Sequence, residues 1–217
     1  MRRLFGKQGR RDSAACATIF ARRARYKSIM HLVLASVLLL MASAVVADEL
    51  LWEKLQKDSN TVVLMRNTES TGNRDGVNML VWDAAGNCNG ESMLTEQGKA
   101  HAKRVGEAFA ERGIKPMVIS SPMCRCAETA KITFGEYITH PDLRQSATTD
   151  ESGMEKFQDK TSALLSRYRG KTPIVFVNHR PNIDSLTMEL LETGDLLIGN
   201  ITDTGEIEVA GRIRIQP

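Results

Sequence analysis

Short apolar runs alternate with amphipathic stretches over residues 61–209. Three of these runs are rich in β-branched side chains, and they predict buried strands at 61–65, 117–120 and 173–178. Two further short runs, 196–199 and 206–209, flank Thr204-Gly205 and predict a hairpin near the end of the chain.

The stretches between the strands have helical character, and we expect helices at 95–112, 123–134, 151–169 and 181–191. In the first of them, Ala102, Val105 and Phe109 form one apolar face. Thr95 is a suitable N-cap and Gly113 a suitable C-terminal residue for that helix. Strands that alternate with helices predict an α/β fold with a largely parallel sheet.

The N-terminal segment has a different pattern. Residues 29–47 read IMHLVLASVLLLMASAVVA, an apolar stretch that follows nine basic residues and one acidic residue in positions 1–30. Small residues at Val45 and Ala47 fit a cleavage site, so we expect a signal peptide at 1–47 and an exported domain at 48–217, periplasmic or secreted. The alternative is an uncleaved inner-membrane anchor that leaves the domain facing the periplasm.

Composition excludes several classes of protein. The 42% hydrophobic and 25% charged residues are ordinary for a globular chain, which disfavours disorder, collagen-like repeats and coiled coil. The net charge of +3 comes from the N-terminal segment, because residues 48–217 carry 20 basic and 25 acidic side chains. A domain with a net charge of −5 is a poor candidate for general nucleic-acid binding.

Three cysteines belong to the exported domain: Cys88, Cys124 and Cys126. In an oxidising compartment this number predicts one disulfide and one free thiol. A zinc site is disfavoured because Cys124-x-Cys126 lacks the usual two-residue spacing and the histidines are isolated. We expect no metal and no cofactor.

Charged and polar residues follow each of the three buried strands. Arg66 ends the first, Arg125 comes soon after the second, and His179 follows the third. The carboxyl ends of parallel strands meet at one edge of a sheet, and arginine forks match phosphate oxygens. The polar stretch 67–92 predicts a long functional loop beside them. The residues alone therefore predict an anion pocket, with phosphate as the favoured anion.

Four motifs in this order resemble the histidine phosphatase superfamily, which has the phosphoglycerate mutase-like fold. They read LMRN at 64–67, LTEQGKA at 94–100, SSPMCRCAETA at 120–130 and IVFVNH at 174–179. The resemblance extends over residues 61–215 and implies a three-layer α/β/α sandwich with a mostly parallel central sheet. The chain is most similar to exported bacterial members, which often have a cysteine in the loop and another before the second arginine.

The resemblance also implies roles for individual residues. Arg66 and Arg125 would bind the phosphoryl oxygens, and His179 would stabilise the transferring group. The histidine that acts as the nucleophile in this family is replaced by Asn67, whose amide nitrogen cannot accept a phosphoryl group because its lone pair is delocalised. We therefore expect an impaired catalyst.

Two further expectations depend on the same resemblance. Asp150 and Glu151 are candidates for the general acid by their place after the third motif, as are Glu69 and Asp83. The cysteine positions imply a disulfide between Cys88 and Cys124, where the loop meets the end of the second strand, and a free Cys126.

Two functions compete on this basis. One is an exported protein that binds a phosphorylated small molecule or envelope sugar with little turnover. The other is an active phosphomonoesterase that uses a substitute nucleophile or direct attack by water, although the nearby hydroxyls of Thr68 and Ser70 lack an evident base. A structural envelope protein with a decaying pocket is a third reading. The sequence does not specify the oligomeric state.

Overall fold

The computed structural model describes residues 48–217 apart from 73–74, 146–150 and 171–172. The expected signal peptide or anchor at 1–47 lies outside the described residues. As far as residues 48–217 are described, no helix combines the length and the apolar character needed to cross a membrane.

One six-stranded sheet forms the centre of the domain. Its strands are β1 (Thr61–Arg66), β2 (Met117–Ser120), β3 (Ile138–Thr139), β4 (Ile174–Asn178), β5 (Leu196–Ile201) and β6 (Ile207–Ile213), in the order β3-β2-β4-β1-β5-β6. The first four strands are mutually parallel, while β5 runs antiparallel to β1 and forms the expected hairpin with β6. The prediction of a mostly parallel sheet is confirmed.

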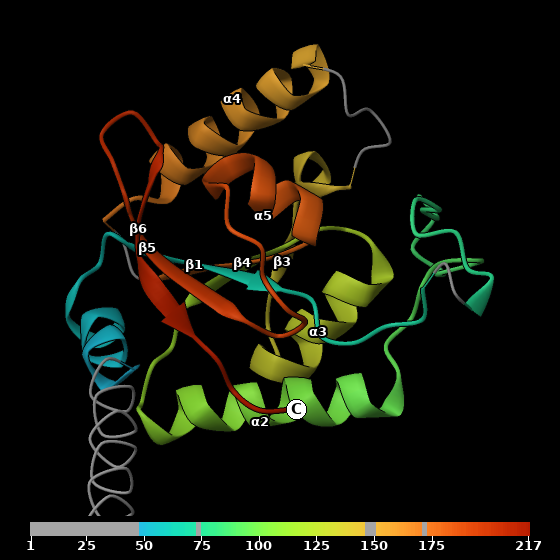
Figure 1. Cartoon of the computed structure of the whole chain (residues 1–217), viewed down its shortest axis with the longest axis horizontal. Coiled ribbons are helices and arrows are strands. Elements are labelled where there is room, and N and C mark those ends of the chain that lie inside the picture. The colour runs from blue at the N-terminus through green and yellow to red at the C-terminus, as the bar shows by residue number, and fades with distance from the viewer. Residues whose placement is uncertain (1–47, 73–74, 146–150, 171–172) are drawn as a thin grey trace, which may run out of the picture. The chain divides into compact units, whose positions relative to one another are not determined.

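Helices cover both faces of this sheet (Figure 1). They are residues 48–57, α2 (Glu96–Glu111), α3 (Cys124–Phe134), the 3-10 turn η2 (Pro141–Leu143), α4 (Glu151–Tyr168) and α5 (Arg180–Thr187). Side chains alternate along β1, so Val63 and Met65 pack in the core under α2 and α3, whereas Val62 and Leu64 pack in the core under α4 and α5. The three-layer α/β/α sandwich is therefore confirmed.

The helix ends follow the sequence signals in part. Thr95 caps α2 by accepting a hydrogen bond from the Gly98 backbone N–H, and Gly113 leaves the helix at a φ of 66°. The helix expected at 181–191 is shorter, because Met188 adopts a left-handed conformation and ends it. The sequence pattern missed β3 and η2, which are too short to show a period, and the helix at 48–57.

Candidate functional site

A cavity of about 450 Å³ opens where β1 and β4 end and where α3 and α5 begin. Among the residues that line it are Arg66, Asn67, Glu69, Arg125, Gln145, His179 and Arg180. The structure thus brings together the two arginines, the histidine and the asparagine that the sequence analysis selected.

The sheet itself positions these residues. Strands β1 and β4 are parallel neighbours with Arg66 paired to Asn178, so both chains leave the sheet at the same level. The Asn67 backbone N–H donates to the Asn178 carbonyl at 3.0 Å, and the Ser121 N–H donates to the Val177 carbonyl at 3.0 Å. Three strand ends are therefore held side by side at the edge of the cavity.

Arg66 lines the cavity, and contacts with Leu191 and Glu192 fix its guanidinium group. Its Nη1 donates to the Leu191 carbonyl oxygen at 2.6 Å and lies 4.0 Å from a Glu192 carboxylate oxygen. Its side chain is 21% exposed, and burial followed by the nearby positive charge of Arg180 lowers its pKa. The other nitrogen atoms of the guanidinium group remain available to bind an anion.

Arg125 is the most deeply buried cation of the site, with 1% of its surface exposed. Its Nη2 donates to Gln145 Oε1 at 2.7 Å, while its Nη1 has no hydrogen-bond partner within the described parts of the chain. Burial lowers its pKa, although a guanidinium of this kind stays charged at neutral pH. A buried charge with an unsatisfied donor beside a cavity favours the binding of an anion there.

His179 is neutral in this site. Its ring is fully buried, and burial followed by the charge of Arg125 lowers its pKa well below the ordinary value. The Nε2 atom lies 2.7 Å from Ser121 Oγ. The backbone is fixed too, because Asn178 Oδ1 accepts hydrogen bonds from the His179 N–H at 2.8 Å and from Asn182 Nδ2 at 2.9 Å.

Asn67 stands where the sequence resemblance implies a nucleophilic histidine. Asn67 Nδ2 donates to the Thr68 carbonyl oxygen at 2.9 Å, and Asn67 Oδ1 lies 4.0 Å from Cys126 Sγ. Burial raises the pKa of the Cys126 thiol to about 12, so it is not a thiolate at neutral pH. The Thr68 hydroxyl faces Thr129 Oγ1 at 3.3 Å instead of a base.

The long loop is tied to the start of α3 by two links. A disulfide joins Cys88 and Cys124, whose Cα atoms are 5.8 Å apart, and Cys126 is free, which confirms the predicted pairing. Glu91 adds a second link, since its Oε2 accepts the Cys124 backbone N–H and its Oε1 accepts the Asp83 N–H, both at 2.7 Å.

The candidate general acids differ in their position relative to the cavity and in their hydrogen-bond partners. Glu69 lines the cavity and accepts a hydrogen bond from the Thr95 hydroxyl at 2.6 Å. Asp83 accepts backbone N–H groups of its own loop, with Asn89 as the leading cause of its lowered pKa. Asp150 and the side chain of Glu151 lie outside the described residues.

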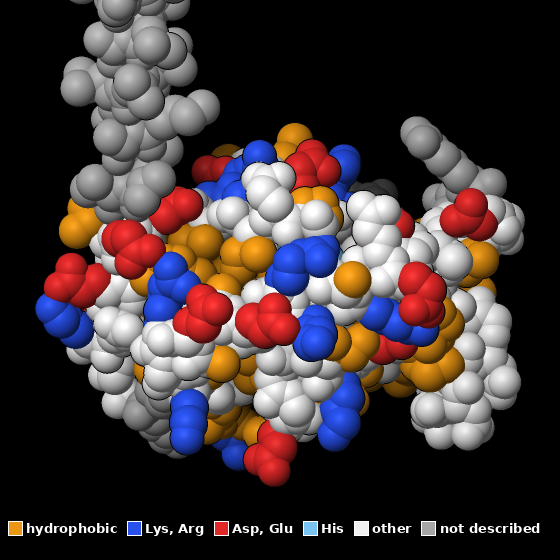
Figure 2. Space-filling model, turned by 90° about the horizontal axis from the view of Figure 1, so that it is seen from below, with side chains coloured by type: hydrophobic (Ala, Val, Ile, Leu, Met, Phe, Trp, Pro, Cys, Tyr) orange, Lys and Arg blue, Asp and Glu red, His pale blue; other side chains and the backbone are white. Residues whose placement is uncertain are grey.

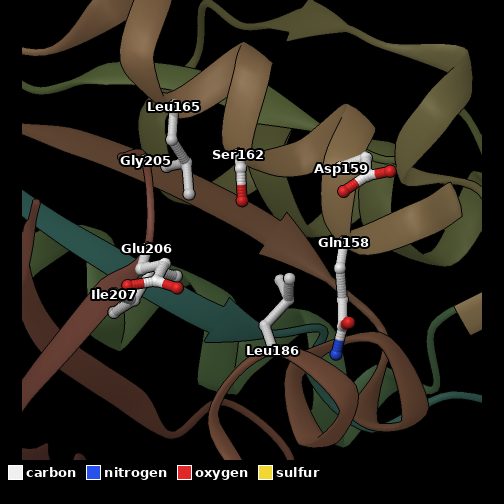
Figure 3. A pocket seen from close by; sticks show the side chains of 8 residues that line it. All are labelled: Gln158, Asp159, Ser162, Leu165, Leu186, Gly205, Glu206 and Ile207. Carbon is white, nitrogen blue, oxygen red and sulfur yellow. The ribbon is translucent and has the colours of Figure 1, made fainter. Parts of the chain in front are cut away.

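A second cavity, of about 420 Å³, lies between α4, α5 and the hairpin of β5 and β6 (Figure 3). Leu165, Leu186 and Ile207 give it apolar walls, and its charged residues are the acids Asp159 and Glu206. An acidic lining of this kind repels phosphate, so this cavity is a poorer candidate for an anion site than the cavity of Arg66 and Arg125. In the part of the chain that the structure describes, His, Cys, Asp and Glu form no group of three that could hold a metal ion.

Four residues of the site escaped the sequence analysis: Glu91, Ser121, Gln145 and Arg180. Two of them had a signal, because Ser121 belongs to the third motif and Arg180 directly follows His179. Glu91 and Gln145 lie in stretches without a motif, and only folding brings them to α3.

Comparisons with known proteins bear on the family and the fold. Residues 62–162 match the model of the histidine phosphatase superfamily, branch 1. No curated protein matches the chain.

Solved structures share the fold at low sequence identity. Phosphoglycerate mutase from Thermus thermophilus is 20% identical with a TM-score of 0.53, over 72% of this chain and 99% of that one. Phosphoserine phosphatase from Entamoeba histolytica, solved with 3-phosphoglyceric acid, is 14% identical with a TM-score of 0.52, over 72% of this chain and 98% of that one. Residues 62–162 are thus similar to the histidine phosphatase superfamily, and the solved structures show that the domain shares the fold of phosphoglycerate mutase.

Proposed function

We propose that this protein is an exported member of the superfamily that binds a phosphate monoester through Arg66, Arg125 and His179 and turns it over little. The observation that carries the proposal is Arg125, a buried cation whose Nη1 lacks an acceptor among the described residues, at the edge of a cavity shared with Arg66. A phosphoryl group supplies several acceptor oxygens to such a pair of forks.

The chemistry of the pocket supports binding more than turnover. Two guanidinium groups stabilise the charge on the phosphoryl oxygens, which is the dominant electrostatic contribution in phosphoryl transfer. The covalent route needs a nucleophile beside them, and Asn67 offers only an amide that donates to the Thr68 carbonyl. The pocket therefore has the phosphate-binding arginines expected of a phosphatase but lacks its nucleophile.

Export is supported by two features of different kinds. The basic and apolar segment 1–47 has the pattern of a signal peptide. The Cys88–Cys124 disulfide is a bond that persists in oxidising compartments. A phosphorylated envelope sugar is then a suitable ligand class.

One observation favours the alternative of an active phosphomonoesterase. Ser121 Oγ lies 2.7 Å from Nε2 of the neutral His179, so this hydroxyl has the adjacent base that Thr68 and Ser70 lack. Ser121 is fully buried and is not among the residues that line the cavity, which argues against this alternative.

Binding and turnover measured on the same purified protein test the proposal. Phosphate and vanadate should raise the melting temperature of the natural protein, and Arg66→Gln should weaken this effect. Arg167→Gln, a change at an exposed position of α4 that is not among the residues lining the cavity, is the matched control and should leave the effect intact. Absence of any stabilisation by either anion would refute the proposal, and hydrolysis of an aryl phosphate abolished by Ser121→Ala would support the alternative.

A further inference from the structure

Residues 191–195, which come directly before β5, hold Arg66 at both its backbone and its side chain. The Arg66 backbone N–H donates to the Asp195 carbonyl oxygen at 3.1 Å, and Arg66 Nη1 donates to the Leu191 carbonyl oxygen at 2.6 Å. We propose that the ion pair of Asp195 and Arg214 positions the guanidinium group of Arg66 for phosphate. This inference rests on the proposed function, since it assumes that Arg66 binds the phosphoryl group.

One peptide group connects the side chains of Arg66 and Asp195. It joins Leu191 to Glu192: its carbonyl oxygen accepts Arg66 Nη1, and its N–H donates to Asp195 Oδ2 at 3.0 Å. Because a peptide group is planar and rigid, the Asp195 carboxylate fixes the direction in which that carbonyl points. A hydrogen bond on each side of the group also polarises it, which strengthens both bonds. The orientation of Arg66 therefore depends on the position of the Asp195 carboxylate.

The carboxylate of Asp195 is in turn held by Arg214. Asp195 is buried, and it accepts two parallel hydrogen bonds, from Arg214 Nε to Oδ1 and from Arg214 Nη2 to Oδ2, both at 2.9 Å. Arg212 lies farther away, with its Nη1 3.7 Å from Asp195 Oδ2, and it donates to Glu189 at 2.9 Å. A bidentate pair fixes geometry as well as distance, so Arg214 determines where the carboxylate lies.

The negative charge of Asp195 also acts on Arg66 directly. Burial, followed by the charge of Arg180, lowers the pKa of Arg66. The carboxylates of Glu192 and Asp195 act in the opposite direction and favour the charged guanidinium. Asp195 is thus close enough to compete with an anion for Arg66, and the positive charge of Arg214 offsets this attraction. Loss of Arg214 would deprive a buried carboxylate of its bidentate partner and increase that competition.

The segment that carries Arg214 has its own anchors. It follows β6 and runs beside α2 (Figure 1). The Ile215 carbonyl oxygen lies 2.7 Å from His101 Nε2, and Arg104 Nε donates to the Gln216 carbonyl oxygen at 3.1 Å. The backbone around Arg214 is therefore fixed by contacts that do not involve the Arg214 side chain, which allows that side chain to set the position of its carboxylate partner.

A double-mutant cycle shows whether Arg214 acts through Asp195. The probe is inorganic phosphate, titrated by calorimetry into the purified full chain. Arg214→Gln should weaken phosphate binding about five- to tenfold when Asp195 is present, as expected for residues of one hydrogen-bond network. In the Asp195→Asn background it should weaken binding less than about twofold, because the carboxylate on which Arg214 acts is absent. A merely structural role would lower the free energy of unfolding without this difference in phosphate affinity.

Two further variants complete the test. Arg104→Gln removes a positive charge and a hydrogen bond from the same C-terminal segment without touching Asp195, so it should keep the phosphate affinity within about twofold of the natural protein. Arg214→Lys keeps the charge and loses the bidentate geometry, so it should weaken binding less than Arg214→Gln does. It also allows the same cycle to be measured if Arg214→Gln does not fold. Urea denaturation verifies that each titrated variant is folded.

The outcomes separate this inference from the proposed function. If the natural protein binds phosphate and substitution of Arg214 has no effect, or has equal effects in both backgrounds, the positioning role is overturned and the phosphate site stands. A loss with Arg104→Gln as large as that with Arg214→Gln would also overturn it, because it would indicate general loosening of the C-terminal segment. Failure of the natural protein to bind phosphate would refute the proposed function, and the positioning role with it.

Discussion

At the scale of single residues, the proposed function predicts that the side chain at position 67 limits catalysis. We expect Asn67→His to give hydrolysis of an aryl phosphate about tenfold or more above the natural protein, because an imidazole at this position can accept the phosphoryl group. Arg66 and Arg125 already line the cavity and can stabilise the negative charge of the phosphoryl group. The measurement is the release of the aryl alcohol under identical conditions for both proteins.

Two controls make this gain interpretable. Asn67→His combined with Arg125→Gln should be inactive, which excludes a contaminating phosphatase. If the natural protein already hydrolyses the ester at a rate that Asn67→Ala leaves unchanged and Arg125→Gln abolishes, another nucleophile operates and the impaired-catalyst proposal fails.

The buried His179 makes stability depend on pH. Its folded-state pKa lies well below the ordinary value of about 6.5, so below that pH the unfolded chain takes up a proton that the folded protein does not. Stability from this group is therefore complete at pH 7 and is lost as the pH falls toward 5, by up to about 1.4 kcal/mol per pH unit. Urea denaturation between pH 7 and 5 should show a shallower loss for His179→Asn, while His101, whose pKa is also lowered by burial, remains in both proteins. Parallel curves for the two proteins would contradict a neutral His179.

At the scale of elements, the first turn of α2 packs directly on the site loop. A Cβ added at Gly98 would overlap the backbone carbonyl of Glu69, the same carbonyl that accepts the Thr95 N–H at 3.1 Å. Helix propensity alone predicts that Gly98→Ala stabilises the protein by up to about 1 kcal/mol. The steric overlap predicts the opposite sign, a loss of about 1–3 kcal/mol, because backbone has to move. Denaturation curves decide the sign, and the exposed change Glu107→Ala on the same helix should stay within about 0.5 kcal/mol of the natural protein.

The disulfide connects two other elements, the long loop and α3. Its cysteines are 36 positions apart, so the double change Cys88→Ser with Cys124→Ser should lower the free energy of unfolding by about 3–4 kcal/mol through the entropy of the unfolded chain. Natural protein under oxidising conditions is the reference, and reduced natural protein should resemble the double variant. Peptide mapping that found a Cys88–Cys126 link, or three free thiols, would contradict the pairing.

At the scale of the whole molecule, basic and acidic residues are distributed unevenly along the sequence, whereas they are mixed on the face of the domain that Figure 2 shows. The N-terminal 30 residues carry nine basic side chains, whereas residues 48–217 have a net charge of −5. On the face of the domain that carries α2, acidic and basic side chains are interspersed (Figure 2). The basic character of the sequence therefore belongs to the segment that we expect to be removed on export.

The mature protein should accordingly begin near Asp48. Val45 and Ala47 supply the small residues of a signal peptidase site after the apolar run. Intact mass spectrometry of the protein extracted from the envelope fraction tests this boundary. A species that retains residues 29–47 would indicate the membrane anchor instead.

Much of the architecture could be predicted because it depends on local patterns. Alternation along β1 and the Thr95 cap of α2 are properties of neighbouring residues. The grouping of Arg66, Arg125 and His179, which end or follow three strands, needs only one further rule, that parallel strands end at the same edge. The end of α5 could not be predicted, because the left-handed Met188 has no sequence signal of the kind that glycine gives.

The sequence by itself determined the class of fold, the identity of the phosphate-binding candidates and the absence of a nucleophilic histidine at Asn67, since these depend on the order and chemistry of the residues. Only the tertiary structure decided which groups meet. The Ser121–His179 hydrogen bond joins residues 58 positions apart, and the Glu91 link to Cys124 joins residues 33 positions apart. Burial keeps His179 neutral and leaves Arg125 Nη1 without an acceptor among the described residues. This burial is also a property of the packed molecule, because segments distant in the chain exclude the water.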